Sequence, residues 1–158
     1  MAEARSGLIA ALSAITMLFA ALTSAYVVRR GISTDWVRLP LPALLYASLA
    51  PVAGTTAVLA VARHRSSVAG FLFAGAGFGV LGCVFQIWAW GSISDAGPAT
   101  AFFHVISAAF LVFVIAGVAG LLLLIWRGRR SSISSHFFYW LYLCVLWAYL
   151  LIFLSLWS

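Results

Sequence analysis

The stretch TMLFAALTSAYVVRRGISTDWVRLPLP (Thr16–Pro42) determines how the rest of the chain is interpreted. It begins as an apolar run of the kind that spans a membrane, and it reaches Tyr26, a residue type enriched at membrane interfaces. The polar segment Arg29–Gly31 predicts that the helix breaks there and that a short polar loop follows. Pro40 and Pro42 then open a second apolar run. The stretch therefore predicts one helix leaving a membrane and a second one returning.

The composition of the whole chain agrees with this interpretation. Of its 158 residues, 65% are hydrophobic and only 8% are charged. Soluble domains carry roughly 25% charged residues, so a chain of this size could not hide its apolar surface from water. We therefore expect an all-α integral membrane protein.

Uncharged stretches long enough to cross a bilayer, about 20 residues each, recur along the chain. They predict a bundle of five transmembrane helices that forms a single membrane domain over residues 1–158. The helices are expected over residues 6–28, 40–62, 67–92, 100–126 and 137–157. Pro51, inside the second of these, should kink the helix or free the carbonyl of Ala47.

The arginines set the expected orientation, because positive residues favour the cytoplasmic side. Six of the nine lie on the side that the N-terminus shares with the second and fourth loops: Arg5, Arg63, Arg65, Arg127, Arg129 and Arg130. The opposite side has Arg29, Arg30 and Arg38. This predicts a cytoplasmic N-terminus and a C-terminus on the opposite side. The same placement at helix ends argues against nucleic-acid binding, despite a net charge of +6.

The membrane interior offers few groups for chemistry. No Asp, Glu, Lys or Arg falls within the core of any span, which argues against an ion-coupled transporter, a proton pump, a channel or an intramembrane hydrolase. His104 is the one histidine expected at depth, while His64 and His136 fall in or near loops on the other side. Bis-histidine haem ligation would need a second histidine at depth. Cys83 and Cys144 have no metal-ligand spacing.

Other polar and small residues suggest helix packing. Gln86 is expected to bridge helices or to contact lipid. Small residues recur four positions apart in the third span, at Gly75 and Gly79, and in the fourth, at Ala116 and Gly120. Such spacing allows helices to approach closely, although glycine is also common in membrane helices generally.

Several short motifs follow one another in a recognisable order. MLFAALTSAYVVRRG (residues 17–31) precedes Asp35-Trp36 and LPLP (39–42), and LPALLYAS occupies residues 41–48. The third span carries LGxxFQxxAW (81–90), and the fourth opens with Phe102-Phe103. The last span contains Tyr139-Trp140 and then Trp147. Together these motifs resemble subunit III of the haem–copper respiratory oxidases, the cytochrome c oxidase subunit III family, in its short five-helix bacterial form.

The chain departs from that family at its polar positions. The family's helix-1 glutamate, its two helix-4 histidines, and its helix-5 histidine and aspartate correspond here to Ile15, Phe110, Phe113, Leu141 and Cys144. In the family these polar groups hold helices together and contact lipid headgroups. No lipid site, and no proton-collecting role for the carboxylate, can therefore be transferred residue by residue.

The resemblance implies an accessory, non-catalytic subunit of a terminal oxidase that reduces oxygen to water and translocates protons across a bacterial inner membrane, with the C-terminus in the periplasm. Haem and copper would belong to subunits I and II, with no cofactor, metal or catalytic residue in this chain. It would stabilise subunit I and hold phospholipid in a cleft between helices 1–2 and 3–5. Whether the oxidase belongs to a respiratory supercomplex stays open. Lipid or partner contacts are expected at Arg29, Arg30, Trp36, Gln86 and His104.

Three alternatives remain open from the sequence. The accessory protein of nitric oxide reductase shares the fold of the resembled family. A haem-binding membrane anchor of a quinone-linked enzyme would require a membrane histidine pair. A small transporter or channel would require a polar pathway. The electron donor, cytochrome c or quinol, and the haem types of the complex also remain open.

Overall fold

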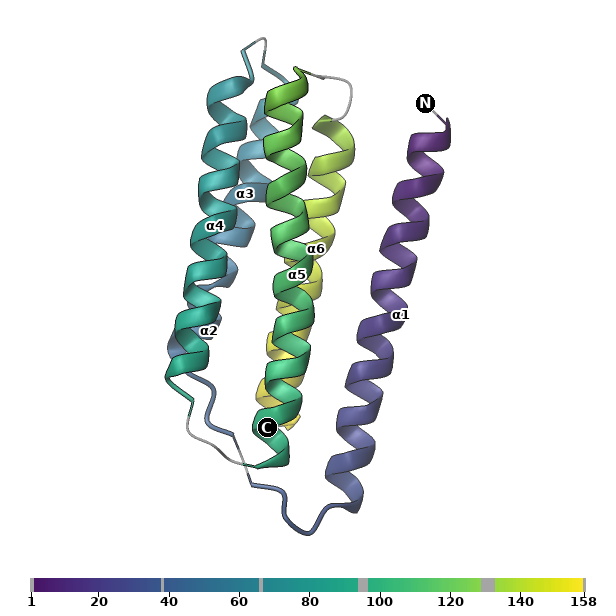
Figure 1. Cartoon of the computed structure of the whole chain (residues 1–158), viewed down its shortest axis with the longest axis vertical. Helices are drawn as coiled ribbons and strands as arrows, with labels where there is room; N and C mark the ends of the chain where they lie inside the picture. Colours follow the sequence, from purple (N-terminus) through teal and green to yellow (C-terminus); the bar gives the residue numbers. More distant parts are fainter. Residues whose placement is uncertain (1, 38, 66, 94–96, 129–132, 158) are drawn as a thin grey trace.

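A computed structural model describes residues 2–37, 39–65, 67–93, 97–128 and 133–157 of the chain, with side chains from residue 6 onward. Every regular element in this part is an α-helix (Figure 1). They are α1 (Ala2–Ile32), α2 (Ala43–Ala47), α3 (Leu49–Ala62), α4 (Ala69–Gly91), α5 (Pro98–Arg127) and α6 (Ile133–Trp157). With α2 and α3 forming one span, five helical stretches are long and apolar enough to cross a membrane. The expected all-helical, five-span architecture is confirmed to that extent.

The first helix does not break at Arg29–Gly31, as the sequence had suggested, but continues to Ile32. Arg29 and Arg30 occupy its last turn, where cationic side chains interact favourably with the unpaired carbonyl groups and the helix dipole. A Cβ atom added at Gly31 would have no neighbour within 4 Å, so the position does not require a glycine for space. The arginines thus end the apolar part of the helix without ending the helix itself.

The second span is interrupted where the proline predicts. Pro51 has no N–H group to donate to the carbonyl four residues earlier, that of Ala47, and the helix breaks between Ala47 and Leu49. Ser48 occupies the break and is buried, with its hydroxyl donating to the Leu45 carbonyl at 2.6 Å. The Trp147 indole N–H on α6 donates to the same hydroxyl at 2.8 Å. The kink therefore becomes an attachment point between the second and last spans.

Two glycines with positive φ set the limits of α5. Gly97, at φ 68°, precedes Pro98, whose fixed φ suits the first position of a helix. Gly128, at φ 61°, ends the helix in the left-handed conformation that glycine adopts without steric cost. The observed α5 is consequently longer than residues 100–126. Likewise, α6 begins at Ile133 rather than at residue 137.

A tryptophan wedged between two glycines organises the packing of α4, α5 and α6. Trp140 is fully buried, and a Cβ atom added at Gly79 of α4 or at Gly117 of α5 would lie 2.9 Å from its ring. On α4, Gly75 also lies close to its neighbours and accepts a hydrogen bond at its carbonyl from Thr55 of α3, at 3.1 Å. The expected close approach therefore occurs at Gly75 and Gly79. On α5 it is Gly117, next to the predicted Ala116, that meets the tryptophan ring.

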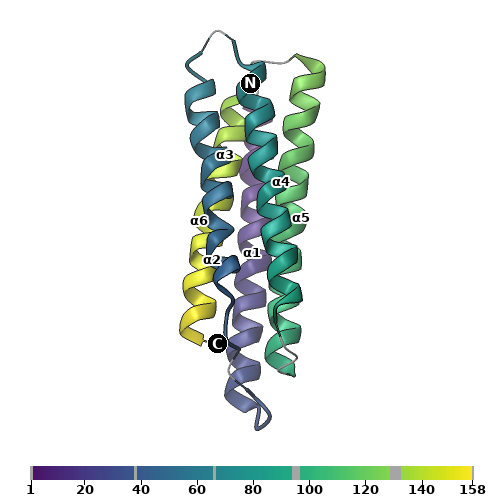
Figure 2. The same ribbon diagram turned by 90° about the vertical axis from the view of Figure 1, so that its left-hand side faces the viewer.

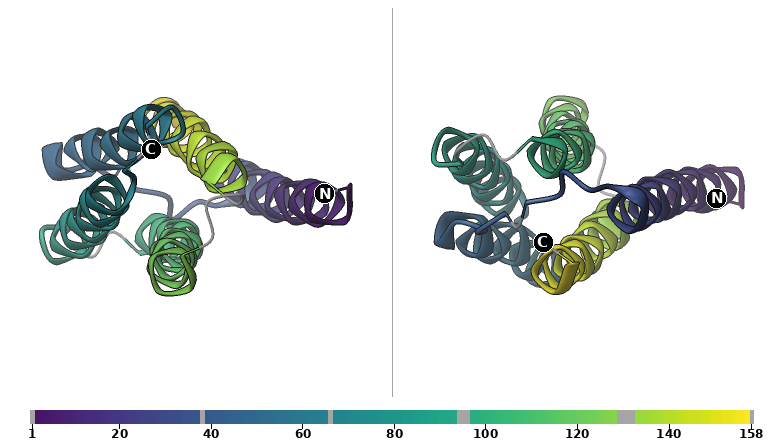
Figure 3. Two further views of the ribbon diagram at one scale, coloured as in Figure 1. Left: turned by 90° about the horizontal axis from the view of Figure 1, so that it is seen from above. Right: turned by 90° about the horizontal axis from the view of Figure 1, so that it is seen from below.

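The helices divide into a bundle and one outlying span. The α2–α3 span packs against α4 and α6, and α5 also packs against α4 and α6. The first helix, α1, has its main contacts only with α5 and α6. Seen from above and below, α1 lies to one side of the others (Figure 3). The expected position of a cleft between helices 1–2 and 3–5 is therefore wrong, because the second span packs within the bundle. The division lies between α1 and the remaining spans.

The spans run roughly along one axis, and the chain ends lie at opposite ends of the molecule (Figures 1 and 2). The end that contains the N-terminus also contains the α3–α4 and α5–α6 connections, with Arg63, Arg65 and Arg127. Arg29 and Arg30 lie at the other end. Arg38, Arg129 and Arg130, and the side chain of Arg5, are outside the described part of the chain.

Candidate functional site

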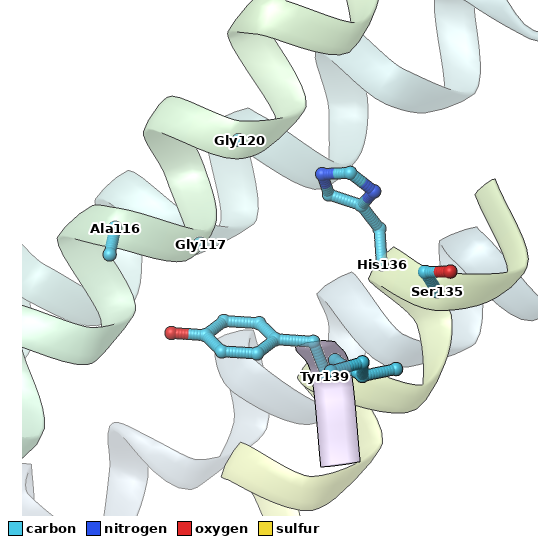
Figure 4. A pocket seen from close by; sticks show the side chains of 7 residues that line it. Ala116, Gly117, Gly120, Ser135, His136 and Tyr139 are labelled. Atoms are coloured by element: carbon cyan, nitrogen blue, oxygen red, sulfur yellow. The ribbon is translucent and has the colours of Figure 1, made fainter. Parts of the chain in front are cut away.

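An open cavity lies where α1 separates from the bundle. Along α1, no described side chain before Ile15 is buried. The described part of the N-terminal half of the helix is therefore exposed or half-buried. At that level a cavity of 260 Å³ is bordered by α1, α5 and α6. Its lining consists of Leu8, Ala116, Gly117, Gly120, Ser135, His136 and Tyr139 (Figure 4).

Small residues on one side and rings on the other shape this cavity. The rings of His136 and Tyr139 extend from α6 toward α5, whose Ala116, Gly117 and Gly120 form the facing wall (Figure 4). The Tyr139 hydroxyl donates to the Phe113 carbonyl at 2.8 Å, which fixes the ring across the gap between α5 and α6. None of the lining side chains carries a permanent charge. The arrangement is suited to an apolar or weakly polar molecule.

The opposite end of α1 is closed by aromatic side chains. Tyr26, buried on α1, makes edge-to-face contacts with Trp36 of the following loop, at 4.9 Å between ring centroids, and with Phe153 of α6, at 5.4 Å. Phe102 of α5 contacts both Tyr26 and Trp36. Trp36 therefore attaches the loop to α1 and α5, while its indole N–H is buried without a hydrogen-bond partner in the described part of the chain.

The arginine pair at this end has partners within the chain. The Arg30 guanidinium lies over the Trp157 ring, 5.4 Å from its centroid, and the Tyr26 hydroxyl donates to the Trp157 carbonyl at 3.2 Å. Arg29, with 42% of its side chain exposed, lies 3.6 Å from the Asp35 carboxylate. Both arginines are half-buried, and each has a partner within the chain.

Asp35 is the acidic group of this loop. A hydrogen bond from the Ser33 hydroxyl and a backbone hydrogen bond lower the pKa of its carboxyl group. Desolvation opposes them, and the nearby Arg29 guanidinium adds a smaller lowering effect. The carboxylate is therefore ionised at neutral pH, and it interacts with Ser33 through a hydrogen bond and with Arg29 through an ion pair.

Gln86 bridges helices, one of the two roles expected for it. It is 2% exposed, and its side-chain amide donates to the Ser107 carbonyl on α5 at 2.5 Å. The Trp90 indole N–H donates to the Ser107 hydroxyl at 2.9 Å, and that hydroxyl donates to the Phe103 carbonyl at 2.7 Å. Ser107 thus connects two residues of the LGxxFQxxAW motif to α5. Spacing within the motif could not identify it.

His104 lies apart from the other histidines. Its ring contacts those of Trp90, at 5.8 Å between centroids, and Phe103, at 5.5 Å. His136 faces Gly120, which is about 24 Å from His104 along α5 at 1.5 Å per residue. His64 accepts a hydrogen bond from Arg63 at the same distant end. No cluster of three His, Cys, Asp or Glu side chains occurs among the described residues. His104 therefore lies beside neither His64 nor His136.

Apolar packing occupies the positions where the resembled family has polar groups. Ile15 is buried, Phe110 stacks on Trp147 at 4.3 Å between centroids, and Phe113 contacts Phe19 of α1. Leu141 is 39% exposed, and Cys144 is half-buried. These five residues form no polar site on the structure.

No protein-family model matches this chain, and no curated protein matches its sequence.

Proposed function

We propose that this chain is an accessory, non-catalytic subunit of a respiratory terminal oxidase, of the subunit III type. The observation that carries the proposal is the position of the motif residues that resemble that family. Gln86 and Trp90 meet Ser107 between α4 and α5, and Trp147 bonds to the kink of the second span. Trp140 packs between two glycines, and Trp36 packs on Tyr26. In this chain the residues that carry the resemblance therefore position the helices relative to one another.

The outer surface of the bundle supports a role in assembly. The chain buries between 17% and 39% of the most apolar window of each span. Large apolar side chains remain exposed along α4, among them Phe73, Val84, Ile87 and Trp88. In a multisubunit oxidase such faces would pack against subunit I or carry phospholipid, which would also cover the outward side of α1. Haem and copper would be bound by subunits I and II.

Purification of a tagged chain tests the proposal. The chain is extracted from bacterial inner membranes in mild detergent, and the purified material is characterised by absorbance spectroscopy and mass spectrometry. We expect a haem-bearing subunit I and a copper-bearing subunit II to co-purify. An unrelated tagged five-span protein from the same membranes serves as the control and should bring neither.

Other results would reject the assignment in different ways. A catalytic partner of the nitric oxide reductase type would identify the chain as the related accessory protein. A Soret band in the chain purified alone would favour the haem-binding anchor. A colourless chain without partners would contradict the oxidase assignment.

A further inference from the structure

The outward face of α1 differs from the outward faces of the other spans. Large apolar side chains are exposed on α4, α5 and α6, for example Trp88, Val112 and Ile152, and such groups suit contact with lipid tails, which are equally apolar. On α1 a line of exposed positions is instead occupied almost entirely by serine and alanine. We name this line the serine seam, and its members are Ser6, Ala10, Ser13, Met17, Ala20 and Ser24.

The serine seam lies nearly opposite the side of α1 that contacts the bundle. At 3.6 residues per turn, the centre of the seam is about 150° round the helix from that of the buried residues Ile15, Phe19, Thr23 and Tyr26. α1 itself lies to one side of the other spans (Figure 3). The chain therefore leaves the seam open to the membrane.

The spacing of the seam is that of two helices packed along their length. Its members alternate four and three residues apart, the heptad period with which helices interdigitate in a left-handed pair. Small residues at these positions let two backbones approach closely, and such packing drives helix association in membranes. A neighbouring line has the same spacing and no hydroxyl group: Gly7, Ala11, Ala14, Leu18, Ala21 and Ala25.

The hydroxyl groups distinguish the serine seam from that neighbouring line. Elsewhere on α1, the Thr16 and Thr23 hydroxyls donate to the Leu12 and Phe19 carbonyls, each at 2.8 Å. The hydroxyls of Ser13 and Ser24 make no hydrogen bond within the described part of the chain. Lipid tails offer neither a donor nor an acceptor. A second helix with hydroxyl groups at the same depth would offer both.

The seam is complementary to itself. Two copies inserted in the same orientation are parallel, and a two-fold axis along the membrane normal places each residue of the seam opposite its own counterpart. A serine hydroxyl both donates and accepts, so Ser13 can pair with Ser13 of a second copy. Alanine leaves room for its counterpart, and the flexible Met17 side chain adapts to its own. No charged residue belongs to the seam, so the arrangement opposes no like charges.

We propose that α1 pairs through the serine seam with α1 of a second copy of this chain, in a parallel two-fold dimer. The inference goes beyond the proposed function and does not rest on it. In an oxidase, the second copy would occupy the outward side of α1 that phospholipid would otherwise cover.

Disulfide cross-linking in membranes tests the contact directly. The free cysteines are removed by Cys83→Ala and Cys144→Ala, and single cysteines are then added to the full-length chain. Met17→Cys lies on the seam, whereas Leu18→Cys lies at almost the same depth on the neighbouring line, about 100° away round the helix. Both side chains are exposed in the native chain. After oxidation we expect a disulfide-linked dimer from Met17→Cys and only monomer from Leu18→Cys.

A matched pair of leucine substitutions gives a second measurement in detergent, where Förster transfer between differently labelled chains reports dimerisation. Ala10→Leu enlarges a side chain on the seam, and Ala11→Leu makes the same change on the neighbouring line. Both positions are exposed, so neither variant disturbs the interior of the chain. We expect the dissociation constant to rise about tenfold or more for Ala10→Leu, because overpacking prevents close approach, and to stay unchanged for Ala11→Leu.

Three results would overturn the proposal. Cross-linking of Leu18→Cys alone, or of both cysteine variants equally, would show that the seam is not the contact. A Met17→Cys adduct with a different polypeptide, identified by mass spectrometry in the absence of a dimer of the chain, would assign the seam to a partner subunit. Monomer at both cysteine positions, with no Förster transfer in the native chain, would show that the seam faces lipid.

Discussion

α1 and α6 are both apolar helices of membrane-spanning length, but the protein uses them differently. The chain buries 39% of the most apolar window of α6 and only 17% of that of α1. α6 places Trp140 and Trp147 fully inside the bundle, each against a specific partner. On α1, the buried side chains within the described residues are Ile15, Phe19, Thr23 and Tyr26. They form one narrow face, and it is confined to the part of the helix that follows the cavity.

The difference shows that apolar character alone does not determine burial in a membrane protein. Lipid tails are as apolar as leucine, so an apolar side chain gains little by leaving lipid, and packing geometry determines which helices associate. α6 has large rings that meet glycines on its neighbours. α1 has its ring cluster around Tyr26 near its C-terminal end, a single ring contact in its middle between Phe19 and Phe113, and mostly small residues elsewhere. α1 is therefore attached at one end and separate at the other.

The attachment of α1 should depend on Tyr26. Replacing it with alanine removes a fully buried ring that contacts Trp36, Phe102 and Phe153. We expect a loss of about 3 kcal/mol, the lower end of the range for truncating a buried aromatic residue. The loss should appear as detachment of α1 with the α3–α6 bundle intact. Unfolding in detergent, followed by circular dichroism, together with limited proteolysis near the α1–α2 loop, would measure both effects.

Tyr26→Phe is the matched control for this experiment. It keeps the ring and removes only the hydrogen bond to the Trp157 carbonyl, so it should cost about 1 kcal/mol or less. If the two variants were equally destabilised, the hydroxyl and not the ring cluster would hold α1.

The bundle should depend instead on close approach at glycine. In Gly79→Ala, the new Cβ atom would lie 2.6 Å from a Val118 methyl group and 2.9 Å from the Trp140 ring. Forcing these groups apart should cost about 2 kcal/mol, as overpacking does in other well-packed interiors. Gly77→Ala, on the same helix with no atom within 4 Å of its added Cβ, should cause no loss. Equal stability of the two variants, measured by the same unfolding assay, would contradict the proposed role of the glycine slot.

The number and extent of the spans could be predicted from the sequence because both depend on local properties. Charge-free length identifies a spanning segment, and Pro51 identifies the interruption of the second one. Arg29 and Arg30 misled the prediction of the end of α1, since a helix can continue beyond the apolar region when its last turn is cationic. The pattern marked the edge of the membrane segment rather than the end of the helix.

The arrangement of the spans could not be predicted in the same way, because it depends on contacts between residues far apart in the chain. Ser48 and Trp147 are hydrogen-bonded although they lie 99 residues apart in the sequence, and no local pattern connects them. Gly117 is one residue from the small pair that the spacing identified, yet it is the one that meets Trp140. The cavity depends on the divergence of α1, which hydropathy does not encode. His136 was assigned to a loop region, and only the structure places it on the cavity wall.

The smallest effect is expected in the loop that closes the attached end of α1, and it should depend on pH. The hydrogen bond from Ser33, a backbone hydrogen bond and the Arg29 guanidinium lower the pKa of Asp35 below its ordinary value of 3.8. A carboxyl group whose pKa is lower in the folded state stabilises that state above the ordinary value, and the contribution is lost as the pH falls through the lowered pKa. The loop should therefore keep its structure at neutral pH and loosen only in strong acid, with α1 remaining attached through Tyr26.

A carbon-13 titration of the Asp35 carboxyl group, with Trp36 fluorescence as a second reporter, would measure the transition. Asp35→Asn should abolish the pH dependence of Trp36, and a carboxyl midpoint at or above 3.8 would show that Ser33 and Arg29 do not stabilise the carboxylate.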